Sequence, residues 1–298
     1  MAYPKSVRIV DVSPRDGLQN VKEAVSTETK VELIRLLKNA GVRDIEVASF
    51  VSPKWVPQMA DAADVLAALD LNDSTNYAVL TPNLKGFERA LASGVQEIAV
   101  FSAASESFTQ KNTNCSIDDS LKRIQDIMRP ALEQNIRIRG YVSCVLGCPY
   151  EGNIEADKVA YVTKKLIDMG CYEVSLGDTI GIGTPLKAKA MLETVLKQVP
   201  ANQIGLHFHD TRGQALANLL SCLEYNIASI DASVAGLGGC PYAKGASGNV
   251  STEDVVYMLH GMGIETGINL DKLAEAGQYI TEQVGIANNS RVGNVLTS

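Results

Sequence analysis

The chain has 298 residues, of which 46% are hydrophobic, 20% charged and 5% aromatic. This composition is that of an ordinary globular protein and excludes a disordered, collagen-like or disulfide-rich chain. Lys and Arg number 27 against 34 Asp and Glu, so the formal net charge is −7, which disfavours nonspecific binding to nucleic acid. Length alone allows one domain or two, because α/β barrels of this size are often single domains.

No stretch of the sequence predicts a membrane span. The longest runs without Asp, Glu, Lys or Arg, such as residues 232–243, fall short of the roughly 20 apolar residues that a spanning helix needs. The N-terminus has neither a signal-peptide core nor an Arg- and Ser-rich transit stretch. The 6 cysteines form no C-x-x-C pair. We therefore expect a cytoplasmic protein with free thiols, and neither a membrane nor a nucleic acid as partner.

Short β-rich apolar runs alternate with longer helical patterns along the chain. The strands we expect are Val7–Ser13, Arg43–Phe50, Asn76–Thr81, Glu97–Ala103, Ile138–Leu146, Tyr172–Gly177, Gln203–His209 and Ser229–Ala235. The helices we expect between them are Thr27–Ala40, Gln58–Leu69, Leu84–Ser93, Ile117–Asn135, Glu155–Met169, Pro185–Gln198 and Gly213–Tyr225. Glycine follows some of these helices directly, as at Met169-Gly170, where a positive φ costs glycine nothing.

Regular alternation of strand and helix predicts parallel strands joined by right-handed crossovers. Eight such units fit an α/β fold of the (β/α)8 TIM-barrel type with a short C-terminal helical extension. We expect one catalytic domain over residues 1–298, with the barrel at about 7–262 and a helical tail at about 263–298 that includes a helix near Leu270–Val284. A doubly wound sheet stays open as an alternative, although no G-x-G-x-x-G motif follows the first strand.

Polar side chains gather where the expected strands end, which is where TIM barrels carry their catalytic groups. They are Arg15, Asp16 and Gln19 after the first strand, Glu46 in the second, Asp178 in the sixth, and His207 and His209 in the seventh. A glycine-rich loop at residues 236–249 follows the eighth strand and contains Cys240. We therefore expect the functional site at this rim of the barrel.

His207 and His209 give the sharpest indication of a metal site. Side chains two residues apart on a strand point to the same face, so both imidazoles would line the barrel near its mouth. Asp16 would add a carboxylate, and mixed ligation of this kind suits Mg²⁺ or Mn²⁺. The alternative is that both histidines are polar barrel-lining residues without a metal. The remaining histidine, His260, is expected in a helix, at the surface or in packing.

Arg15 and Cys240 are two further candidates for chemistry. An inward-facing guanidinium needs a partner. Arg15 would therefore hold a carboxylate, stabilise an enolate oxygen, or form a structural ion pair with Glu46. Cys240 lies among small residues in a loop of a kind that closes over substrates. The alternative for a lone cysteine is an inert small hydrophobic residue.

Three segments together resemble the hydroxymethylglutaryl-CoA lyase family. They are Ser13-Pro14-Arg15-Asp16-Gly17-Leu18-Gln19-Asn20, His207-Phe208-His209-Asp210-Thr211-Arg212-Gly213 and Gly238-Gly239-Cys240-Pro241-Tyr242-Ala243-Lys244-Gly245-Ala246-Ser247-Gly248-Asn249. The stretches Glu46–Trp55 and Ser175–Thr179 add to the resemblance, which runs from about Val7 to Met258. The first two segments are shared by a wider group of metal-dependent TIM-barrel lyases and Claisen synthases, whereas the glycine-rich cysteine loop points to the lyase.

The resemblance implies a lyase that uses Mg²⁺ or Mn²⁺ to cleave 3-hydroxy-3-methylglutaryl-CoA into acetyl-CoA and acetoacetate, and that forms a homodimer. The metal ligands it implies are Asp16, His207, His209 and Asn249. The catalytic residues it implies are Arg15 at the enolate, Cys240 in proton transfer, Asp16 and His207 as candidate bases, and Glu46 and Asp178 as supporting polar residues near Arg15 and the metal. The acyl-CoA contacts it implies are Arg15, Gln19, Lys111 and Asn112.

Other functions stay open at this stage. A related lyase could act on a longer branched 3-hydroxyglutaryl-CoA, because pocket depth is not readable from sequence. A Claisen synthase of the same superfamily would usually carry a longer C-terminal region than this chain has. A pyruvate-type aldolase would leave the cysteine loop unexplained. A catalytically silent barrel would be expected to lack one of Arg15, Asp16, His207, His209 or Cys240, and all are present.

Overall fold

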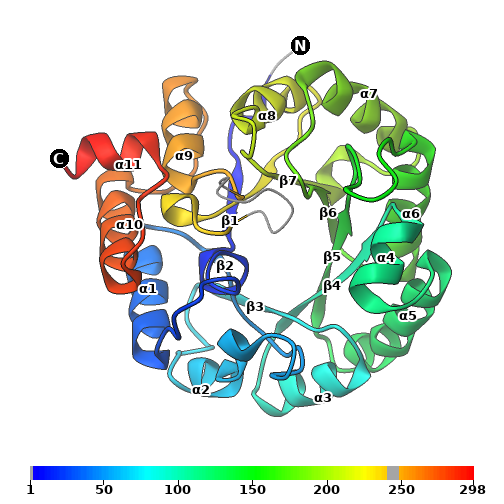
Figure 1. The fold of residues 1–298 in the computed structure, drawn as a ribbon, viewed down its shortest axis with the longest axis horizontal. Helices are drawn as coiled ribbons and strands as arrows, with labels where there is room; N and C mark the ends of the chain where they lie inside the picture. Colours follow the sequence, from blue (N-terminus) through cyan, green and yellow to red (C-terminus); the bar gives the residue numbers. More distant parts are fainter. Residues whose placement is uncertain (1–2, 240–247) are drawn as a thin grey trace.

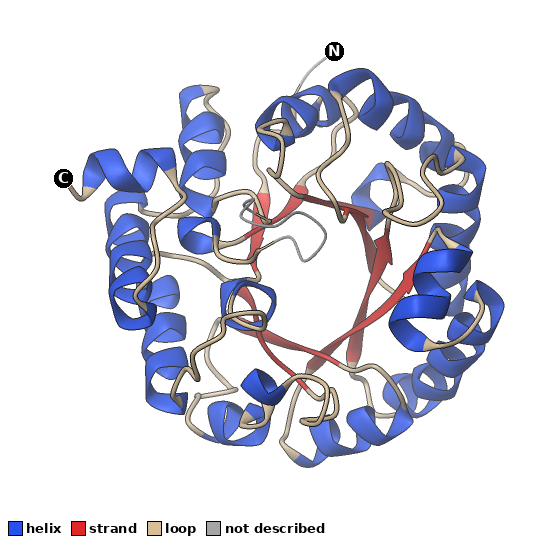
Figure 2. Ribbon diagram, in the orientation of Figure 1, coloured by secondary structure: helices blue, strands red, loops and turns tan. Residues whose placement is uncertain are grey.

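Parallel strands close into a barrel in the computed structural model, which describes residues 3–239 and 248–298. The strands are β1 (Arg8–Asp11), β2 (Asp44–Ser49), β3 (Asn76–Leu80), β4 (Glu97–Ala103), β5 (Arg137–Ser143), β6 (Glu173–Asp178), β7 (Ile204–Phe208) and β8 (Ser229–Ala232). Each strand pairs with the next in chain order, and β8 pairs with β1. Figure 2 shows the strands as an inner ring enclosed by helices. The predicted TIM barrel is confirmed.

The helices surround this barrel in the order of the chain (Figure 1). They are α1 (Thr27–Asn39), α2 (Ala62–Ala67), α3 (Leu84–Ala92), α4 (Glu106–Thr113), α5 (Ile117–Glu133), α6 (Ala156–Met169), α7 (Pro185–Leu196), α8 (Ala215–Leu223), α9 (Thr252–Gly261), α10 (Leu270–Val284) and α11 (Arg291–Leu296). Many begin where a side-chain oxygen caps the first turn, as Ser26 does for α1 and Asn269 for α10. The end of α6 at Gly170, with φ of 118°, is the predicted glycine stop.

All the expected strands are present within a few residues of their predicted bounds, but three local features differ from the prediction. The short helices α4 and α11 were not expected, because α4 is largely polar and α11 has only 6 residues. The expected helix at Gln58–Leu69 is shorter, because Pro57 starts a separate 3-10 turn before α2. A short π-helix at Ser13–Gly17 replaces the end of the first expected strand.

The C-terminal helices complete the wall of the barrel. In Figure 1, α10 lies beside α1, with α9 and α11 next to it. The backbone N–H of Asn269 donates to the carbonyl of Ala40, and that of Val7 donates to the carbonyl of Glu265. The predicted helical tail is thus packed against the beginning of the chain. Within the described residues, no helix combines the length and apolar character required to cross a membrane.

The inside of the barrel is unusually rich in charge. Apolar side chains fill the layer between strands and helices. The strands also carry buried charged residues, among them Glu46, Glu97, Arg139, Glu173 and Asp231. Buried charges are costly unless they are paired and hydrogen-bonded. Arg139 pairs with both Glu173 and Asp231 inside the barrel. Glu46 pairs with Arg15, which lies beyond the carboxyl end of β1.

Candidate active site

Three predicted metal ligands meet at the mouth of the barrel. One ligand atom each from Asp16, His207 and His209 lies within 4.8 Å of the other two. Asp16 is presented by the π-helix that follows β1, and the two histidines stand at the end of β7. The imidazole centroids are 5.4 Å apart. Strand alternation therefore brings both rings to the same side, as the sequence predicted.

Asp16 is held as a charged carboxylate. Gln19 Nε2 donates to its Oδ1 at 3.0 Å, Asn249 Nδ2 donates to its Oδ2 at 2.8 Å, and Arg15 Nη1 also donates to Oδ1. Burial raises the pKa of Asp16, but Arg15 and the two imidazoles outweigh burial and lower that pKa to about 2. At neutral pH the cluster therefore contains a negative charge in a fixed position.

His209 offers a ring nitrogen that no other group of the described residues uses. Its Nδ1 is buried and has no hydrogen-bond partner among residues 3–239 and 248–298. Burial and the neighbouring His207 ring lower the pKa of His209 to about 4, so the imidazole is neutral near pH 7. Buried polar atoms normally have partners, and one without a partner calls for an explanation such as an ion. A neutral imidazole beside a carboxylate fits a divalent cation.

Asn249, the last residue of the glycine-rich loop, touches the cluster. It forms an isolated bridge with His209, and its Nδ2 also donates to the carbonyl of Leu237 at 3.1 Å. As placed, the amide nitrogen faces Asp16. A half-turn of the amide would present the oxygen that a metal requires. The prediction that Asn249 is a ligand therefore rests on its position next to Asp16.

Arg15 lies between Asp16 and Glu46. Its Nε donates to Glu46 Oε1, and Tyr141 donates its hydroxyl to Glu46 Oε2 at 2.8 Å. The structural ion pair considered from sequence is therefore present. The third guanidinium nitrogen, Nη2, makes no hydrogen bond within the described part of the chain, although Arg15 is only 6% exposed. One strong donor is thus left available beside the carboxylate.

Asp178 is placed differently from the other candidates. It ends β6, is fully buried, and accepts hydrogen bonds from the backbone N–H groups of Ile182 and Gly183 at 3.2 and 2.8 Å. Burial raises its pKa against the effect of these hydrogen bonds. Its carboxylate thus secures the loop after β6, and these hydrogen bonds do not reach Arg15. A role for Asp178 near the metal stays a prediction.

The remaining predicted residues lie around the mouth or outside the described ranges. Lys111 and Asn112 are exposed on α4, and Lys111 Nζ lies 4.8 Å from the centroid of the Tyr150 ring. Their contact with substrate stays a prediction. Cys240 belongs to residues 240–247 and lies outside the described part.

Several side chains that hold the cluster in place from inside the barrel were not predicted from sequence. Asp231 on β8 lies behind His207, and Tyr141 and Arg139 on β5 connect it to Glu46. A signal was available, because Arg139 and Tyr141 are two residues apart on a strand expected to be buried. Polar side chains at that spacing would both face the barrel interior.

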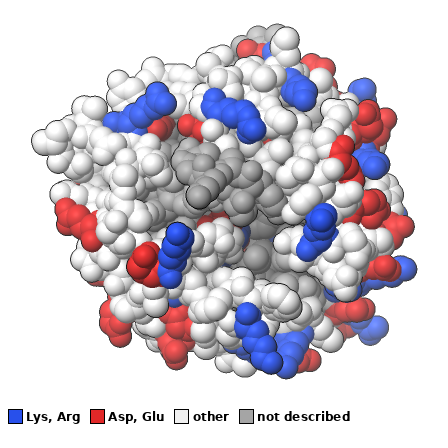
Figure 3. Space-filling model, in the orientation of Figure 1, with Lys and Arg blue, Asp and Glu red and all other residues white. Residues whose placement is uncertain are grey.

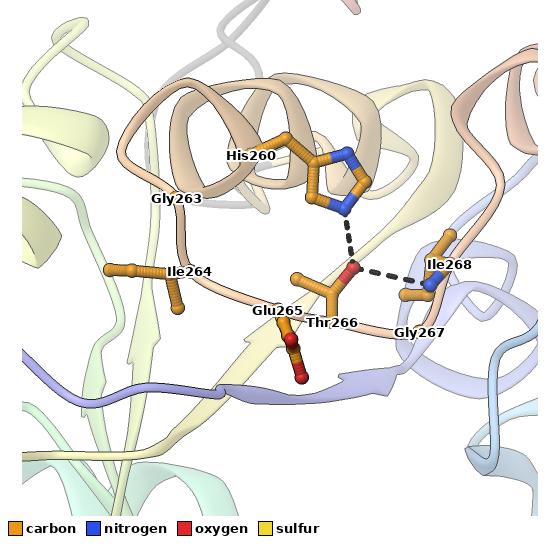
Figure 4. A pocket seen from close by; sticks show the side chains of 7 residues that line it. All are labelled: His260, Gly263, Ile264, Glu265, Thr266, Gly267 and Ile268. Carbon is orange, nitrogen blue, oxygen red and sulfur yellow. Dashed lines mark hydrogen bonds between the residues drawn. The ribbon is translucent and has the colours of Figure 1, made fainter.

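A surface pocket lies away from the cluster of Asp16, His207 and His209 (Figure 4). It is lined by His260, Gly263, Ile264, Glu265, Thr266, Gly267 and Ile268. His260 Nε2 lies 2.8 Å from Thr266 Oγ1, and the two side chains point toward each other between α9 and the turn that follows it. Glu265 pairs with the backbone before β1, which is the end of the barrel opposite Asp16. His260 is therefore an exposed residue outside the cluster of Asp16, His207 and His209, as expected from sequence.

Charge is distributed unevenly on the face seen along the barrel. Figure 3 shows several Lys and Arg side chains around the central depression, while Asp and Glu side chains gather mainly toward the edges. The net charge of −7 belongs to the whole chain and not to this opening. A negatively charged ligand would thus approach a locally favourable rim.

In sequence, the chain is similar to hydroxymethylglutaryl-CoA lyases over nearly its whole length. The sequence model described as HMGL-like matches residues 6–280. The mitochondrial hydroxymethylglutaryl-CoA lyase of Bos taurus is 59% identical over 290 residues, which are 97% of this chain and 89% of that protein. The cytoplasmic 3-hydroxy-3-methylglutaryl-CoA lyase of Mus musculus is 56% identical over 289 residues, which are 97% of this chain and 84% of that protein.

Solved structures agree in fold and in sequence. The crystal structure of hydroxymethylglutaryl-CoA lyase from Pseudomonas aeruginosa has a TM-score of 0.98 and 54% identity, and the match covers 100% of this chain and 99% of that one. An HMG-CoA lyase from Acinetobacter baumannii in complex with coenzyme A and 3-methylmalate has a TM-score of 0.93 and 34% identity, with 99% and 96% coverage.

Proposed function

This chain belongs to the HMGL-like family, and we propose that it is a divalent-metal-dependent carbon–carbon lyase that cleaves 3-hydroxy-3-methylglutaryl-CoA into acetyl-CoA and acetoacetate. The observation that carries the proposal is the cluster of Asp16, His207 and His209 with Arg15 beside it. The names of relatives that match nearly the whole chain support the same reaction.

The reaction places three demands on the site. A hydroxyl proton must leave the substrate, the C–C bond must break, and the thioester enolate that forms must be stabilised. A cation held by Asp16, His207 and His209, with Asn249 as a further proposed ligand, would supply Lewis acidity toward the substrate hydroxyl. The two imidazoles favour Mn²⁺ over Mg²⁺, because Mg²⁺ prefers oxygen ligands.

Arg15 is suited to the charge that develops on the thioester oxygen. Glu46 and Asp16 hold two of its nitrogens, and Tyr141 in turn holds Glu46. The guanidinium is therefore oriented before substrate arrives, and Nη2 is left to donate a hydrogen bond. A preoriented donor stabilises a developing oxyanion better than water does, because it needs no reorganisation during the reaction.

Proton transfer is assigned to two parts of the site. Asp16 would accept the hydroxyl proton from its place at the cluster, and His207, the other candidate base, would do so only through a ring nitrogen that neither carries a proton nor binds the cation. Cys240 would protonate the enolate carbon, because an unperturbed thiol has a pKa of about 8.5, close to working pH. We propose that Asp178 supports the site by holding the loop after β6 in place. We propose that Gln19, Lys111 and Asn112 contact the acyl-CoA.

The direct test is turnover by the purified protein. With Mn²⁺ or Mg²⁺ present, 3-hydroxy-3-methylglutaryl-CoA should yield acetyl-CoA and acetoacetate in equal amounts, detected by mass spectrometry. Cleavage of a longer branched 3-hydroxyglutaryl-CoA in preference would reassign the substrate. Full activity after removal of metal by a chelator would refute the metal-dependent mechanism.

We further propose a cytoplasmic homodimer that acts on an acyl-CoA and has no nucleic acid or membrane as partner. Residues 1–298 would form one catalytic domain, because α10 packs against α1 and α9. Light scattering after size-exclusion chromatography would measure the oligomeric state. A monomer at working concentration would contradict the proposed dimer.

A further inference from the structure

Asp231 lies inside the barrel directly behind His207. The two residues are register partners in the parallel pair of β7 and β8. Asp231 Oδ2 lies 3.2 Å from His207 Nδ1, and the carboxylate is buried. Since Nδ1 is occupied from behind, Nε2 is the ring nitrogen of His207 that is left for the side of Asp16 and His209.

The Asp231 carboxylate is held on both of its oxygens. Arg139 donates from Nη2 to Oδ1 at 2.7 Å and from Nη1 to Oδ2 at 3.1 Å. Ser175 donates its hydroxyl to Oδ2 at 2.8 Å. Arg139 is itself only 1% exposed and is anchored through Nε to Glu173 Oε1 at 2.7 Å. A carboxylate fixed in this way cannot swing away from His207.

The same arginine also supports the other side of the site. Arg139 Nη1 donates to the Tyr141 hydroxyl at 3.0 Å, and that hydroxyl donates to Glu46, the partner of Arg15. Two chains of contacts therefore leave Arg139. One reaches the cluster at His207 through Asp231, and the other reaches it at Asp16 through Tyr141, Glu46 and Arg15.

We propose that Asp231 is a positioning residue that keeps the His207 ring in the Nδ1–H tautomer with Nε2 directed at the metal cluster. The inference rests on the proposed function, since it takes His207 as a metal ligand. A carboxylate behind a ligating imidazole fixes the orientation of the ring and strengthens it as a ligand. The competing reading is that Asp231 only neutralises Arg139, which would leave metal affinity unchanged.

Metal binding by the metal-free protein separates the two readings without using catalysis. Mn²⁺ is titrated into the protein, and the free ion is followed by electron paramagnetic resonance. Asp231→Asn is expected to weaken Mn²⁺ binding by about 10- to 100-fold. Ser175→Ala removes another hydrogen bond from the same carboxylate without touching His207, and it should bind like the unmodified protein.

The outcomes are distinguishable. Equal affinity of Asp231→Asn and the unmodified protein would overturn the inference while the metal site stands. If the unmodified protein binds no Mn²⁺, the metal assignment under the proposed function fails, and the inference fails with it. An equal loss in Ser175→Ala would indicate general disturbance of the barrel interior and would also count against a specific role for Asp231.

A second measurement needs no substitution at Asp231, which matters because Asp231→Asn leaves Arg139 short of a buried counter-charge. The chain has only 3 histidines, so their imidazole ¹⁵N resonances can be assigned with His260→Ala and His209→Ala. In the metal-free protein at alkaline pH, His207 is expected to carry its proton on Nδ1. A proton on Nε2, or a mixture of tautomers, would overturn the inference.

Discussion

The backbone N–H of Ala235 donates to both carboxylate oxygens of Glu253, at 2.9 and 3.0 Å. Ala235 has a φ of 56°, in the left-handed region that costs free energy for any residue with a Cβ. Ser251 donates its hydroxyl to the same carboxylate at 2.9 Å. Glu253 therefore secures the turn from which the glycine-rich loop departs.

This buried carboxyl predicts a pH dependence of stability. Burial raises the pKa of Glu253 from its ordinary value of 4.5 to about 8. Between these values the folded state holds a proton that the unfolded chain releases, so the free energy of unfolding falls as pH rises. Glu253→Gln should reduce that fall, as measured by urea unfolding at several pH values across the window.

The matched control for this prediction is Glu282→Gln, which neutralises an exposed glutamate on α10. It should leave the pH dependence as it is in the unmodified protein. If Glu253→Gln and Glu282→Gln show the same slope of the free energy of unfolding against pH, then protonation of Glu253 does not cause the pH dependence.

Arg15→Lys is expected to lower kcat by about 100- to 1,000-fold, the usual loss when a preoriented oxyanion donor is removed. Lysine keeps the charge, but its donors sit on one nitrogen and lack the planar fork by which the guanidinium reaches Glu46, Asp16 and a substrate oxygen together. Mn²⁺ affinity should change little by comparison. The control is Arg137→Lys, at the first residue of β5 and thus at the barrel end opposite the site. Stopped-flow or steady-state kinetics measures both variants. Near-normal kcat in Arg15→Lys would remove Arg15 from enolate stabilisation.

Asp16→Asn is expected to weaken Mn²⁺ binding by more than about 100-fold, because it removes the only negative charge among the three clustered ligands. Calorimetric titration measures the effect. His260→Ala, which removes an imidazole far from the cluster, should bind Mn²⁺ normally. Retention of full affinity by Asp16→Asn would show that the ion binds elsewhere.

Cys240→Ala is expected to keep the metal but to lose turnover by about 100-fold or more, the contribution typical of a positioned proton donor. Cys115→Ala, at a buried cysteine outside the cluster, is the control and should stay active. The comparison of Mn²⁺ binding with turnover in both variants checks the prediction. Normal turnover without the Cys240 thiol would exclude it from the mechanism.

Periodicity was sufficient to predict the barrel and the close approach of Asp16, His207 and His209. The paired histidines two residues apart on β7, and Asp16 just after β1, required only strand alternation and the rule that TIM-barrel sites lie at the carboxyl ends of strands. The helix α4 was not predictable in the same way, because it is held by its Ser105 cap and by packing near β4.

The supporting residues could not be found without knowing which side chains of different strands meet inside the barrel. Asp231 and His207 are 24 positions apart, and Tyr141 and Glu46 are 95 apart. A sequence states which residues are polar but not which strand each will face across the barrel. For Asp178, a buried carboxylate at a strand end suggested chemistry, whereas its hydrogen bonds serve the backbone of its own loop.

The closure of the barrel between β1 and β8 has a consequence for how the protein is made. β1 leaves the ribosome first among the strands, but its partner Ser229–Ala232 is made last. Until then, the growing sheet has an open edge at β1 whose N–H and C=O groups are unpaired, and such edges invite pairing with other chains. A chain that stops between residues 210 and 228 would therefore be prone to aggregate, even though it contains Asp16, His207 and His209.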